Sequence, residues 1–409
     1  MSLKRVVITG CGAVSPFGLG KKALFDGIWA GHSAVQVMPG WGHIKGLKSL
    51  LAAPVPDFDS KELLPRSLRR TMGPMGIYAA LAAKEAVNDA GLDETKLASG
   101  SVGVAIGSTT GSPTAYEDFY RSFLPTEAID QVKSGEFFKI MGHSCAANVC
   151  LFLGINGEQW SPVSACTSAS QAIGLGYLLI QAGRQQAMLC GGADEVHPSV
   201  TGVFDVVRAA SCRNDDPAVS SRPFDRDRDG VVCGGGSGVL VLESYDSAMT
   251  RGAAIYGEIL GFGHVNDSKH IANPHEESMT RAMENALNDA GIDRAEVDYV
   301  NAHATSTELG DVAEARAILS VVGKNTPVSS VKGHIGHTLG AAGSLETIIV
   351  LEMLARQELV PTLNLDNPDP RCGEIDLFRQ LKKQKISTVI KNNFALGGVN
   401  VALVIRRFA

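Results

Sequence analysis

The 409-residue sequence lacks several features that mark specialised classes of protein. No apolar stretch approaches the roughly 18 residues that span a bilayer, so we expect no membrane segment. The net charge of −6 gives no general signature of nucleic-acid binding. Aromatic residues make up only 6%, but hydrophobic residues reach 44% and charged residues 20%, which is the composition of an ordinary globular protein.

The eight cysteines include no CxxC pair, which argues against a zinc ribbon and against a disulfide framework. A reducing compartment suits such thiols. The apolar N-terminal run is broken by glycines and followed by a proline, so it fits a buried first strand better than a signal peptide. These observations predict a cytoplasmic protein.

Three short motifs are too incomplete to indicate a ligand. ITGCGAVSPFG has Ser15 where a dinucleotide-binding loop needs its third glycine. The segment DRDRDG, which starts at Asp225, begins like a calcium loop, but Gly236 stands where the bidentate glutamate belongs. We expect its arginines and aspartates to pair with one another instead. His334 and His337 have HxxH spacing without an accompanying ligand pattern, so no metal is expected.

Two similar segments lie 200 residues apart, AVNDAGLDETKL from Ala86 and ALNDAGIDRAEV from Ala286. Each ends a helical pattern at a glycine, Gly91 or Gly291, and then leads into a strand-like run. Alternating strands and helices of this kind predict βαβ units with mostly parallel sheets. The chain therefore reads as two duplicated halves of an α/β protein, arranged in five layers.

We place the halves at 1–250 and 251–409, because a chain this long exceeds the usual size of a single core. The loop-rich segments 30–70 and 107–148 interrupt the duplicated pattern and are expected to build a pocket or a dimer surface. Close packing of two central helices explains a set of small residues, which are Gly174, Gly176, Gly340, Ala341, Ala342 and Gly343.

Cys166 lies in SACTSASQAIGLG, between a strand-like SPVSA and a helical run. A cysteine chosen at random is most often a small buried hydrophobe. At the start of a helix, however, free backbone N–H groups and the helix dipole favour a thiolate and lower its pKa. The same turn offers the N–H of Cys166 to a developing oxyanion, and small neighbours leave room for a thioester.

Two histidines lie in turn-forming settings after strand-like runs, His303 in NAHATST and His337 in VKGHIGHTLGAAG. Each alone is as consistent with a core histidine as with a catalytic one. Together with Cys166 they form a candidate nucleophile and a pair of imidazoles.

The ordered motifs SACTSAS, SRPFDRDRDG, NAHATSTELGD, SVKGHIGHTLGAAG and NNFALGGVN resemble those of the elongating β-ketoacyl-[acyl-carrier-protein] synthases of the thiolase superfamily. The resemblance covers essentially the whole chain. It implies a thiolase-like αβαβα fold and an acyltransferase. The implied reaction is a decarboxylating Claisen condensation of malonyl-[acyl-carrier protein] with an acyl chain, as in fatty-acid elongation.

The resemblance also implies residue roles. Cys166 holds the acyl chain as a thioester, and His303 and His337 hydrogen-bond the malonyl thioester oxygen. The second oxyanion is held by the N–H groups of Cys166 and Leu396. The other implied positions are Lys332 with its acidic partner Glu314, the nearby Asp311, the phosphopantetheine-binding Thr305 and Thr307, and the gating pair Phe394 and Leu396.

The implied partner is an acyl carrier protein, which is acidic, so a local basic patch is expected near the tunnel mouth. The resemblance further implies a dimer of identical or different chains. It implies no cofactor beyond the phosphopantetheine on the carrier. The candidate carrier-binding residues are Arg66, Arg69, Arg70, Arg208 and Arg213.

The chain departs from the family pattern in its gating loop, where ALGGVN replaces GFGGTN, and at Ala304, where the family usually has glycine. These departures favour, as an alternative, a specialised polyketide or aryl-polyene ketosynthase that works with a partner subunit. A non-catalytic chain-length partner is disfavoured by the presence of Cys166. A thiolase or CoA-dependent initiating synthase is disfavoured by the two-histidine set.

Overall fold

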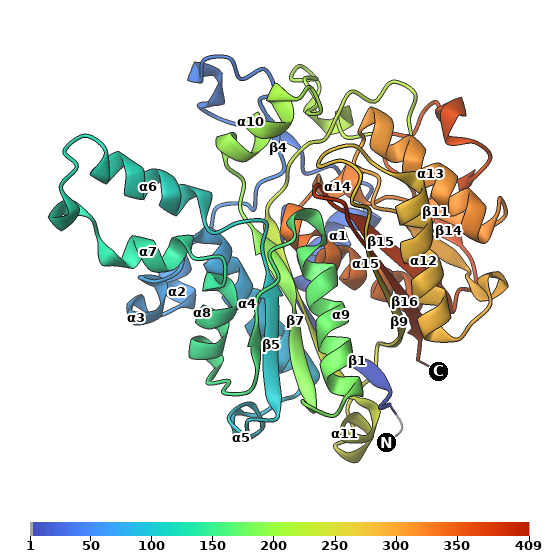
Figure 1. Ribbon diagram of the computed structural model, residues 1–409, viewed down its shortest axis with the longest axis horizontal. Helices are drawn as coiled ribbons and strands as arrows, with labels where there is room; N and C mark the ends of the chain where they lie inside the picture. The colour runs from blue at the N-terminus through green and yellow to red at the C-terminus, as the bar shows by residue number, and fades with distance from the viewer. Residues whose placement is uncertain (1–2, 409) are drawn as a thin grey trace.

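Each half of the chain builds a mixed sheet, and the computed structural model describes them over residues 3–408 (Figure 1). The strands of the N-terminal half follow the order β1 (Val6–Ser15), β8 (Gly236–Ser244), β7 (Ala187–Asp194), β5 (Val102–Gly107) and β6 (Gln159–Trp160). Those of the C-terminal half follow the order β9 (Gly257–Asn266), β16 (Val399–Arg407), β15 (Thr388–Phe394), β10 (Tyr299–Asn301), β11 (Pro327–Ser329) and β13 (Asp376–Leu377). Antiparallel pairing of β1 with β9 joins the two sheets.

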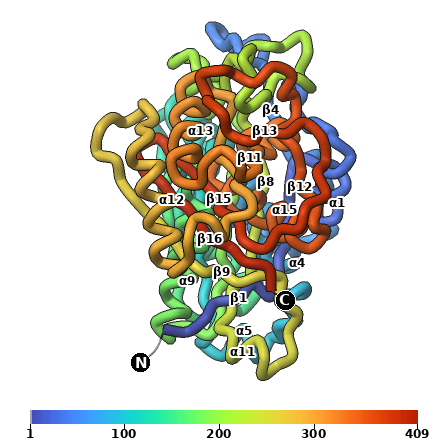
Figure 2. The backbone as a smooth tube through the Cα atoms, turned by 90° about the vertical axis from the view of Figure 1, so that its right-hand side faces the viewer, coloured from blue at the N-terminus to red at the C-terminus, as the bar shows by residue number. Residues whose placement is uncertain are grey.

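Three layers of helices enclose the two sheets. The outer helices of the N-terminal half are α4 (Pro74–Ala90) and α8 (Ser144–Leu153), and those of the C-terminal half are α12 (Glu276–Ala290) and α13 (Glu308–Val322). The middle helices α9 (Ser168–Gln181) and α15 (Ala342–Arg356) contact each other and strands of both halves. Figure 2 shows β15 and β16 between α12 and α15. The predicted five-layer, thiolase-like α/β architecture is confirmed, but the expectation of mostly parallel sheets is wrong, because half of the pairings along the strand order are antiparallel.

The duplication is visible in how each outer helix meets its sheet. Glycines on the strand let the backbone of the helix approach closely, because a Cβ there would overlap helix atoms. These glycines are Gly10 and Gly12 on β1 against α4, and Gly261 and Gly263 on β9 against α12. The glycines that resemble a dinucleotide-binding motif therefore serve packing. Both helices end at a left-handed glycine, Gly91 (φ 66°) and Gly291 (φ 64°).

The predicted small residues do allow close packing, but only Gly343 lies between the two middle helices, whereas Gly174 and Gly176 face strands and Gly340 faces Asp194. A Cβ on Gly174 of α9 would overlap the Phe262 ring, and one on Gly343 of α15 would overlap the Ser170 hydroxyl. One buried apolar cluster continues from α9 and α15 into strands of both halves. The two halves are thus held together by a shared interior.

The inserted segments are more regular than predicted. Within 107–148 lie α6 (Pro113–Phe123) and α7 (Ser134–Ile140), which pack on each other away from the sheets (Figure 1). Ser112 accepts a hydrogen bond from the N–H of Ala115 and so caps α6, a local signal that the sequence carried. The strand expected over SPVSA is wrong, because β6 ends at Trp160 and residues 161–164 are irregular.

The remaining elements are short or peripheral. They are β2 (Gly18–Leu19), α1 (Gly20–Trp29), β3 (Gln36–Val37), β4 (Leu51–Ala52), α2 (Ser60–Leu63), α3 (Arg66–Arg69), α5 (Glu94–Leu97), α10 (Pro198–Val206), α11 (Tyr245–Thr250), α14 (Lys332–Ile335), β12 (Glu358–Leu359) and β14 (Lys382–Lys383), with short 3-10 turns between them. Over residues 3–408, no helix is both long enough and apolar enough to span a bilayer.

Candidate active site

Cys166 lies in a 3-10 turn, Ala165–Thr167, that runs directly into α9. Ala165 adopts a left-handed φ of 50°, which is uncommon for a residue with a Cβ. Such backbone strain recurs where a nucleophile is presented at the start of a helix. Cys166 is 6% exposed. Its placement at a helix N-terminus agrees with the sequence pattern.

The sulfur and both imidazoles meet in one buried cluster at the junction of the two halves. Nε2 of His337 lies 2.9 Å from Sγ of Cys166. The rings of His303 and His337 lie edge to face, with their centroids 5.1 Å apart. One sulfur or nitrogen atom from each of the three residues lies within 4.8 Å of the others. The long-range convergence expected of these residues is therefore present.

Thiolate and imidazole are also ligands that zinc takes. A closed structural zinc site uses four protein ligands, whereas this group has three members among the described residues. The cluster could therefore hold a metal only with an open coordination position.

Burial decides the protonation state of the thiol. It raises the pKa of Cys166 to about 12, although the charge of Lys332 acts to lower it. This direction is opposite to the one expected from the helix terminus. Burial, with Lys332 nearby, also lowers the pKa of His337 to about 3. The resting pair is thus a neutral thiol beside a neutral imidazole that is close enough to accept its proton.

The turn that carries His303 is held by Glu314 of α13. The two carboxylate oxygens of Glu314 accept the backbone N–H groups of His303 (2.7 Å) and Ala304 (2.6 Å). Burial raises the pKa of Glu314 to about 7. The predicted pairing of Glu314 with Lys332 is wrong. Both carboxylate oxygens of Glu314 accept hydrogen bonds from this turn, and Lys332 forms its ion pair with Glu346.

Glu346 joins two buried lysines, and sequence reasoning missed this cluster. Its carboxylate contacts Nζ of Lys332 and lies 2.7 Å from Nζ of Lys391, and the three side chains are at most 1% exposed. Glu346 comes from α15 and Lys391 from β15, and each is buried with no other charged residue within four positions along the chain. That isolation was the available signal, since a lone charge in a buried element needs a partner.

Asp311 and the DRDRDG turn form a second network of buried charges. Asp311 accepts the N–H of Phe224 at 2.8 Å, and its carboxylate lies 3.6 Å from Arg228. Burial raises the pKa of Asp311 to about 6. Arg222 lies 3.1 Å from Asp225, which is fully buried. Within SRPFDRDRDG, Arg222 pairs with Asp225 and Arg226 with Asp227, as predicted, whereas Arg228 pairs with Asp311 and Asp369 outside the segment.

Of the predicted pantetheine and gating residues, Phe394 lies beside a histidine ring. The hydroxyl oxygens of Thr305 and Thr307 lie 3.1 Å apart, after β10. Phe394 is buried, with its ring centroid 6.2 Å from that of His303. Leu396 is 44% exposed in the turn between β15 and β16. Only the first of the two gating side chains is therefore packed against the site.

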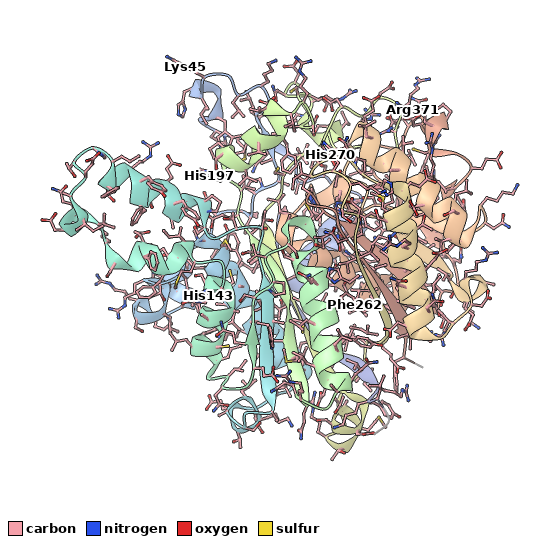
Figure 3. The ribbon with its side chains drawn as sticks, in the orientation of Figure 1. Lys45, His143, His197, Phe262, His270 and Arg371 are labelled. Atoms are coloured by element: carbon pink, nitrogen blue, oxygen red, sulfur yellow. The ribbon has the colours of Figure 1, made fainter. Side chains whose placement is uncertain are left out.

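The gating turn is tied to the loop that follows β9. The N–H of Gly397 donates to the carbonyl of Ile271 (2.7 Å), and the N–H of Asp267 donates to the carbonyl of Gly398 (3.0 Å). His270, labelled in Figure 3, belongs to this loop. Motion of the turn must therefore involve residues 267–271.

The candidate carrier-binding arginines do not form one cluster within a single chain. Arg66 and Arg69 belong to α3 and Arg70 directly follows it, whereas Arg208 and Arg213 follow α10, and Figure 1 shows these helices far apart. Arg213 lies 3.6 Å from Asp229 and is half-buried.

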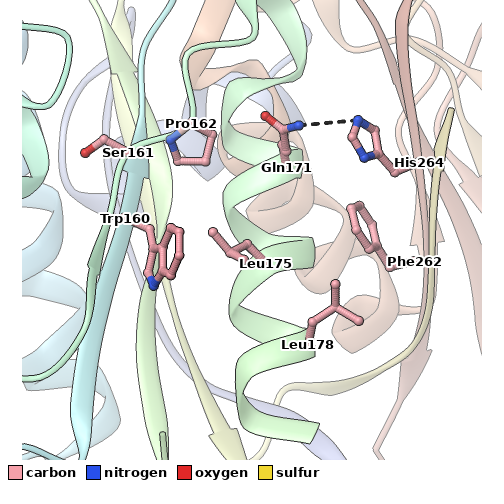
Figure 4. Close-up of a pocket in the computed structure, with 8 residues that line it drawn as sticks. All are labelled: Trp160, Ser161, Pro162, Gln171, Leu175, Leu178, Phe262 and His264. Atoms are coloured by element: carbon pink, nitrogen blue, oxygen red, sulfur yellow. Dashed lines mark hydrogen bonds between the residues drawn. The ribbon is translucent and has the colours of Figure 1, made fainter. Parts of the chain in front are cut away.

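Sequence reasoning also missed a hollow of about 330 Å³ on the outward face of α9 (Figure 4). Leu178 (46% exposed) and Trp160 (41% exposed) give it an apolar character, and Nε2 of Gln171 lies 3.3 Å from Nε2 of His264 across it. Its lining residues are Trp160, Ser161, Pro162, Gln171, Leu175, Leu178, Phe262 and His264. None of the three clustered residues lines it.

The sequence matches two family profiles in succession. The beta-ketoacyl synthase N-terminal domain matches residues 3–248, and the beta-ketoacyl synthase C-terminal domain matches residues 256–366. The chain belongs to the β-ketoacyl synthase family.

Relatives of this β-ketoacyl synthase match along their full length. It is 38% identical to the 3-oxoacyl-[acyl-carrier-protein] synthase 2 of Coxiella burnetii (100% of this chain, 99% of the relative). It is 35% identical to the protein of the same name from Synechocystis (99% and 98%).

Solved structures agree. A beta-ketoacyl synthase from Burkholderia phymatum superposes with a TM-score of 0.96 at 42% identity (99% and 100% covered). The ishigamide ketosynthase/chain length factor gives a TM-score of 0.93 at 30% identity (100% of both chains).

Proposed function

We propose that this β-ketoacyl synthase catalyses the decarboxylating condensation of malonyl-[acyl-carrier protein] with an acyl chain held on Cys166, in fatty-acid elongation. One observation carries the proposal. The sulfur of Cys166 and the imidazoles of His303 and His337 converge in a single buried cluster. Full-length similarity to 3-oxoacyl-[acyl-carrier-protein] synthases supports the same reaction.

Acyl transfer comes first. Sγ of Cys166 attacks the thioester carbonyl of the acyl carrier, and Nε2 of His337, 2.9 Å away, takes the thiol proton. The N–H of Cys166, with that of Leu396, holds the resulting oxyanion. The carbon–sulfur bond of the carrier then breaks, and the carrier thiolate leaves with the proton from His337.

Decarboxylation and condensation follow on the acylated enzyme. Carbon dioxide leaves the malonyl group, and the electron pair of the broken bond forms an enolate whose oxygen accepts an N–H hydrogen bond from Nε2 of His303 and, once the neutral ring of His337 has moved its proton from Nδ1 to Nε2, a second one from His337. The enolate carbon attacks the Cys166 thioester, and the cysteine sulfur leaves as a thiolate that takes a proton from water. Protein residues perform each step, so the proposed reaction uses no metal or cofactor beyond the pantetheine of the carrier.

Two assignments complete the proposal. The donor of both substrates is an acyl carrier protein, as in a solved relative that is a ketosynthase in complex with its type II polyketide synthase acyl-carrier protein.

The working unit is a homodimer in the cytoplasm. The exposed edge strand β6 and the apolar hollow on α9 support the dimer, because an unpaired strand edge and exposed Trp160 and Leu178 favour burial by a second copy.

The experiment combines two half-reactions. Incubation with acyl-carrier protein is expected to add one acyl mass to the Cys166 peptide. His303→Ala is expected to keep this transfer, whereas its rate of carbon dioxide release from malonyl-carrier protein should fall by about a hundredfold or more. Cys212→Ala, at an exposed thiol, is the matched control and should change neither step. An unmodified Cys166, or normal decarboxylation by His303→Ala, contradicts the mechanism.

A second candidate function is polyketide or aryl-polyene synthesis together with a partner subunit. The observation that favours it is the close superposition on a ketosynthase/chain length factor. The replacement of the family's usual gating phenylalanine by Leu396 also favours it. A panel of acyl primers distinguishes the two, since preference for polyunsaturated or polyketide primers, appearing only with a second subunit, would replace the fatty-acid assignment.

A further inference from the structure

Asn393 lies between His303 and the lysine–glutamate cluster, and its side-chain amide contacts four groups there. Nδ2 lies 3.2 Å from Nδ1 of His303 and 3.1 Å from Oε2 of Glu346. Oδ1 accepts from Nζ of Lys391 and, at 2.5 Å, from the hydroxyl of Ser170. Asn393 is fully buried. Both polar atoms of its side chain therefore hydrogen-bond to groups inside the protein.

These partners allow only one orientation of the amide. Amide nitrogen and oxygen exchange places by a half-turn, so the hydrogen-bond partners must decide between them. A lysine ammonium has only donors, so Lys391 must face Oδ1. A carboxylate has only acceptors, so Glu346 must face Nδ2. Both partners select the same orientation, in which an N–H of Asn393 points at His303.

The orientation of Asn393 in turn determines the tautomer of His303. An N–H that points at Nδ1 requires a lone pair there, so a neutral imidazole carries its proton on Nε2. Burial, with Lys332 nearby, holds the pKa of His303 well below its ordinary value, so the ring is neutral. Nε2–H is then the hydrogen-bond donor left for a substrate.

We propose that Asn393, oriented by Lys391 and Glu346, is a positioning residue that fixes His303 in its Nε2–H tautomer for donation to the enolate oxygen. The inference rests on the proposed function, since it assigns His303 a donor role in decarboxylation. It adds the Asn393 amide to the groups that decarboxylation requires, besides Cys166, His303 and His337.

Asn393→Asp tests the proposal with a near-isosteric change. The new carboxylate accepts from Nδ1–H, so the neutral ring carries its proton on the wrong nitrogen and Nε2 loses its donor. Carbon dioxide release from malonyl-carrier protein near neutral pH should fall by about a hundredfold, the cost of one lost oxyanion donor. Acyl transfer to Cys166 does not use this donor. The fold-loss in the rate of acyl transfer should therefore be at least about tenfold smaller than the fold-loss in carbon dioxide release.

The pH profile separates positioning from a merely structural role. The added carboxylate raises the pKa of His303, and protonation restores the Nε2–H donor. Decarboxylation by Asn393→Asp should therefore rise as pH falls, while that of the wild type should not. The titratable groups that face His303 are the same in both proteins, namely Cys166, Glu314, Lys332, His337, Glu346 and Lys391.

The matched control is Asn148→Asp, which makes the same change at a buried asparagine of α8 that contacts Ser144 and Thr71. It should leave both half-reactions unchanged. Decarboxylation by Asn393→Asp within about threefold of the wild type would overturn the inference, because a lost oxyanion donor costs far more. So would an unaltered pH profile, or an equal loss of acyl transfer.

A direct measurement covers the case in which the variant does not fold. Nitrogen-15 NMR of histidine-labelled wild-type protein, with His303→Gln used to assign the signal, should show a neutral ring protonated at Nε2. A ring protonated at Nδ1 overturns the inference. Wild-type protein that releases no carbon dioxide from malonyl-carrier protein refutes the proposed function itself, which is a different outcome from an active enzyme indifferent to Asn393.

Discussion

Glu346→Gln is expected to destabilise the protein strongly, because it removes the carboxylate that two buried lysines share. Lys332 and Lys391 are at most 1% exposed, so neither ammonium can turn to water. Breaking one buried ion pair costs about 3–5 kcal/mol, and here one substitution leaves two charges uncompensated, so the loss should lie at the upper end or beyond.

Glu352→Gln on the same helix is the matched control. Glu352 forms a partly exposed i,i+4 pair with Arg356, which is worth only about 0.3–0.5 kcal/mol. Urea denaturation followed by circular dichroism, at fixed protein concentration, compares the two variants with the wild type. Equal midpoint shifts for Glu346→Gln and Glu352→Gln would refute the reasoning.

The difference in free energy of unfolding between Glu346→Gln and the wild type should also depend on pH. Burial lowers the pKa of Lys391 to about 8, and Glu346 is a group that raises it, so the substitution lowers the pKa further. A lysine whose pKa is depressed on folding binds more protons in the unfolded chain, so the stability of the protein rises with pH between its folded and unfolded pKa values. Folded Lys391 is protonated differently in the two proteins only below about pH 8, so the gap in unfolding free energy should widen as pH falls below that value and narrow as pH rises through it. If the difference in unfolding free energy does not change with pH, buried, unpaired lysines are not the cause of the destabilisation.

Two further predictions concern the surface and the core. Charge reversal of Arg66, Arg69 and Arg70 to glutamate should weaken the binding of acidic carrier protein and reduce its salt dependence, measured by fluorescence anisotropy at low and high salt; unchanged affinity would make these residues ordinary surface. Gly174→Ala should cost about 1–3 kcal/mol of stability, because its methyl group overlaps the Phe262 ring, and adding Phe262→Leu should recover part of the loss.

The parts of the fold that could be predicted are those determined by local pattern. Gly91 and Gly291 each stop a helix by adopting a left-handed conformation, which is a property of the residue itself. The turn at Cys166 likewise follows from small residues before an apolar helical run. The duplicated halves, the five layers and the placement of the nucleophile could therefore be deduced from the amino-acid sequence alone.

The parts that sequence reasoning missed depend on which side chains meet across elements. Glu314 was assigned to Lys332, but two nearby backbone N–H groups satisfy it. Glu346 and Lys391 meet only because α15 and β15 both point them into the same interior space. The hollow on α9 arises from side chains of three separate elements. None of these pairings is encoded by spacing along the chain.

The strained turn before α9 has a counterpart in the other half. Leu339 (φ 52°) precedes α15 as Ala165 (φ 50°) precedes α9, so Gly340 holds the position that corresponds to Cys166. A side chain at Gly340 would find its Cβ only 2.6 Å from an Asp194 oxygen and 2.8 Å from the Thr109 nitrogen. The C-terminal half therefore has no room for a nucleophilic side chain at the position that corresponds to Cys166, so at this pair of positions only the N-terminal half can carry one.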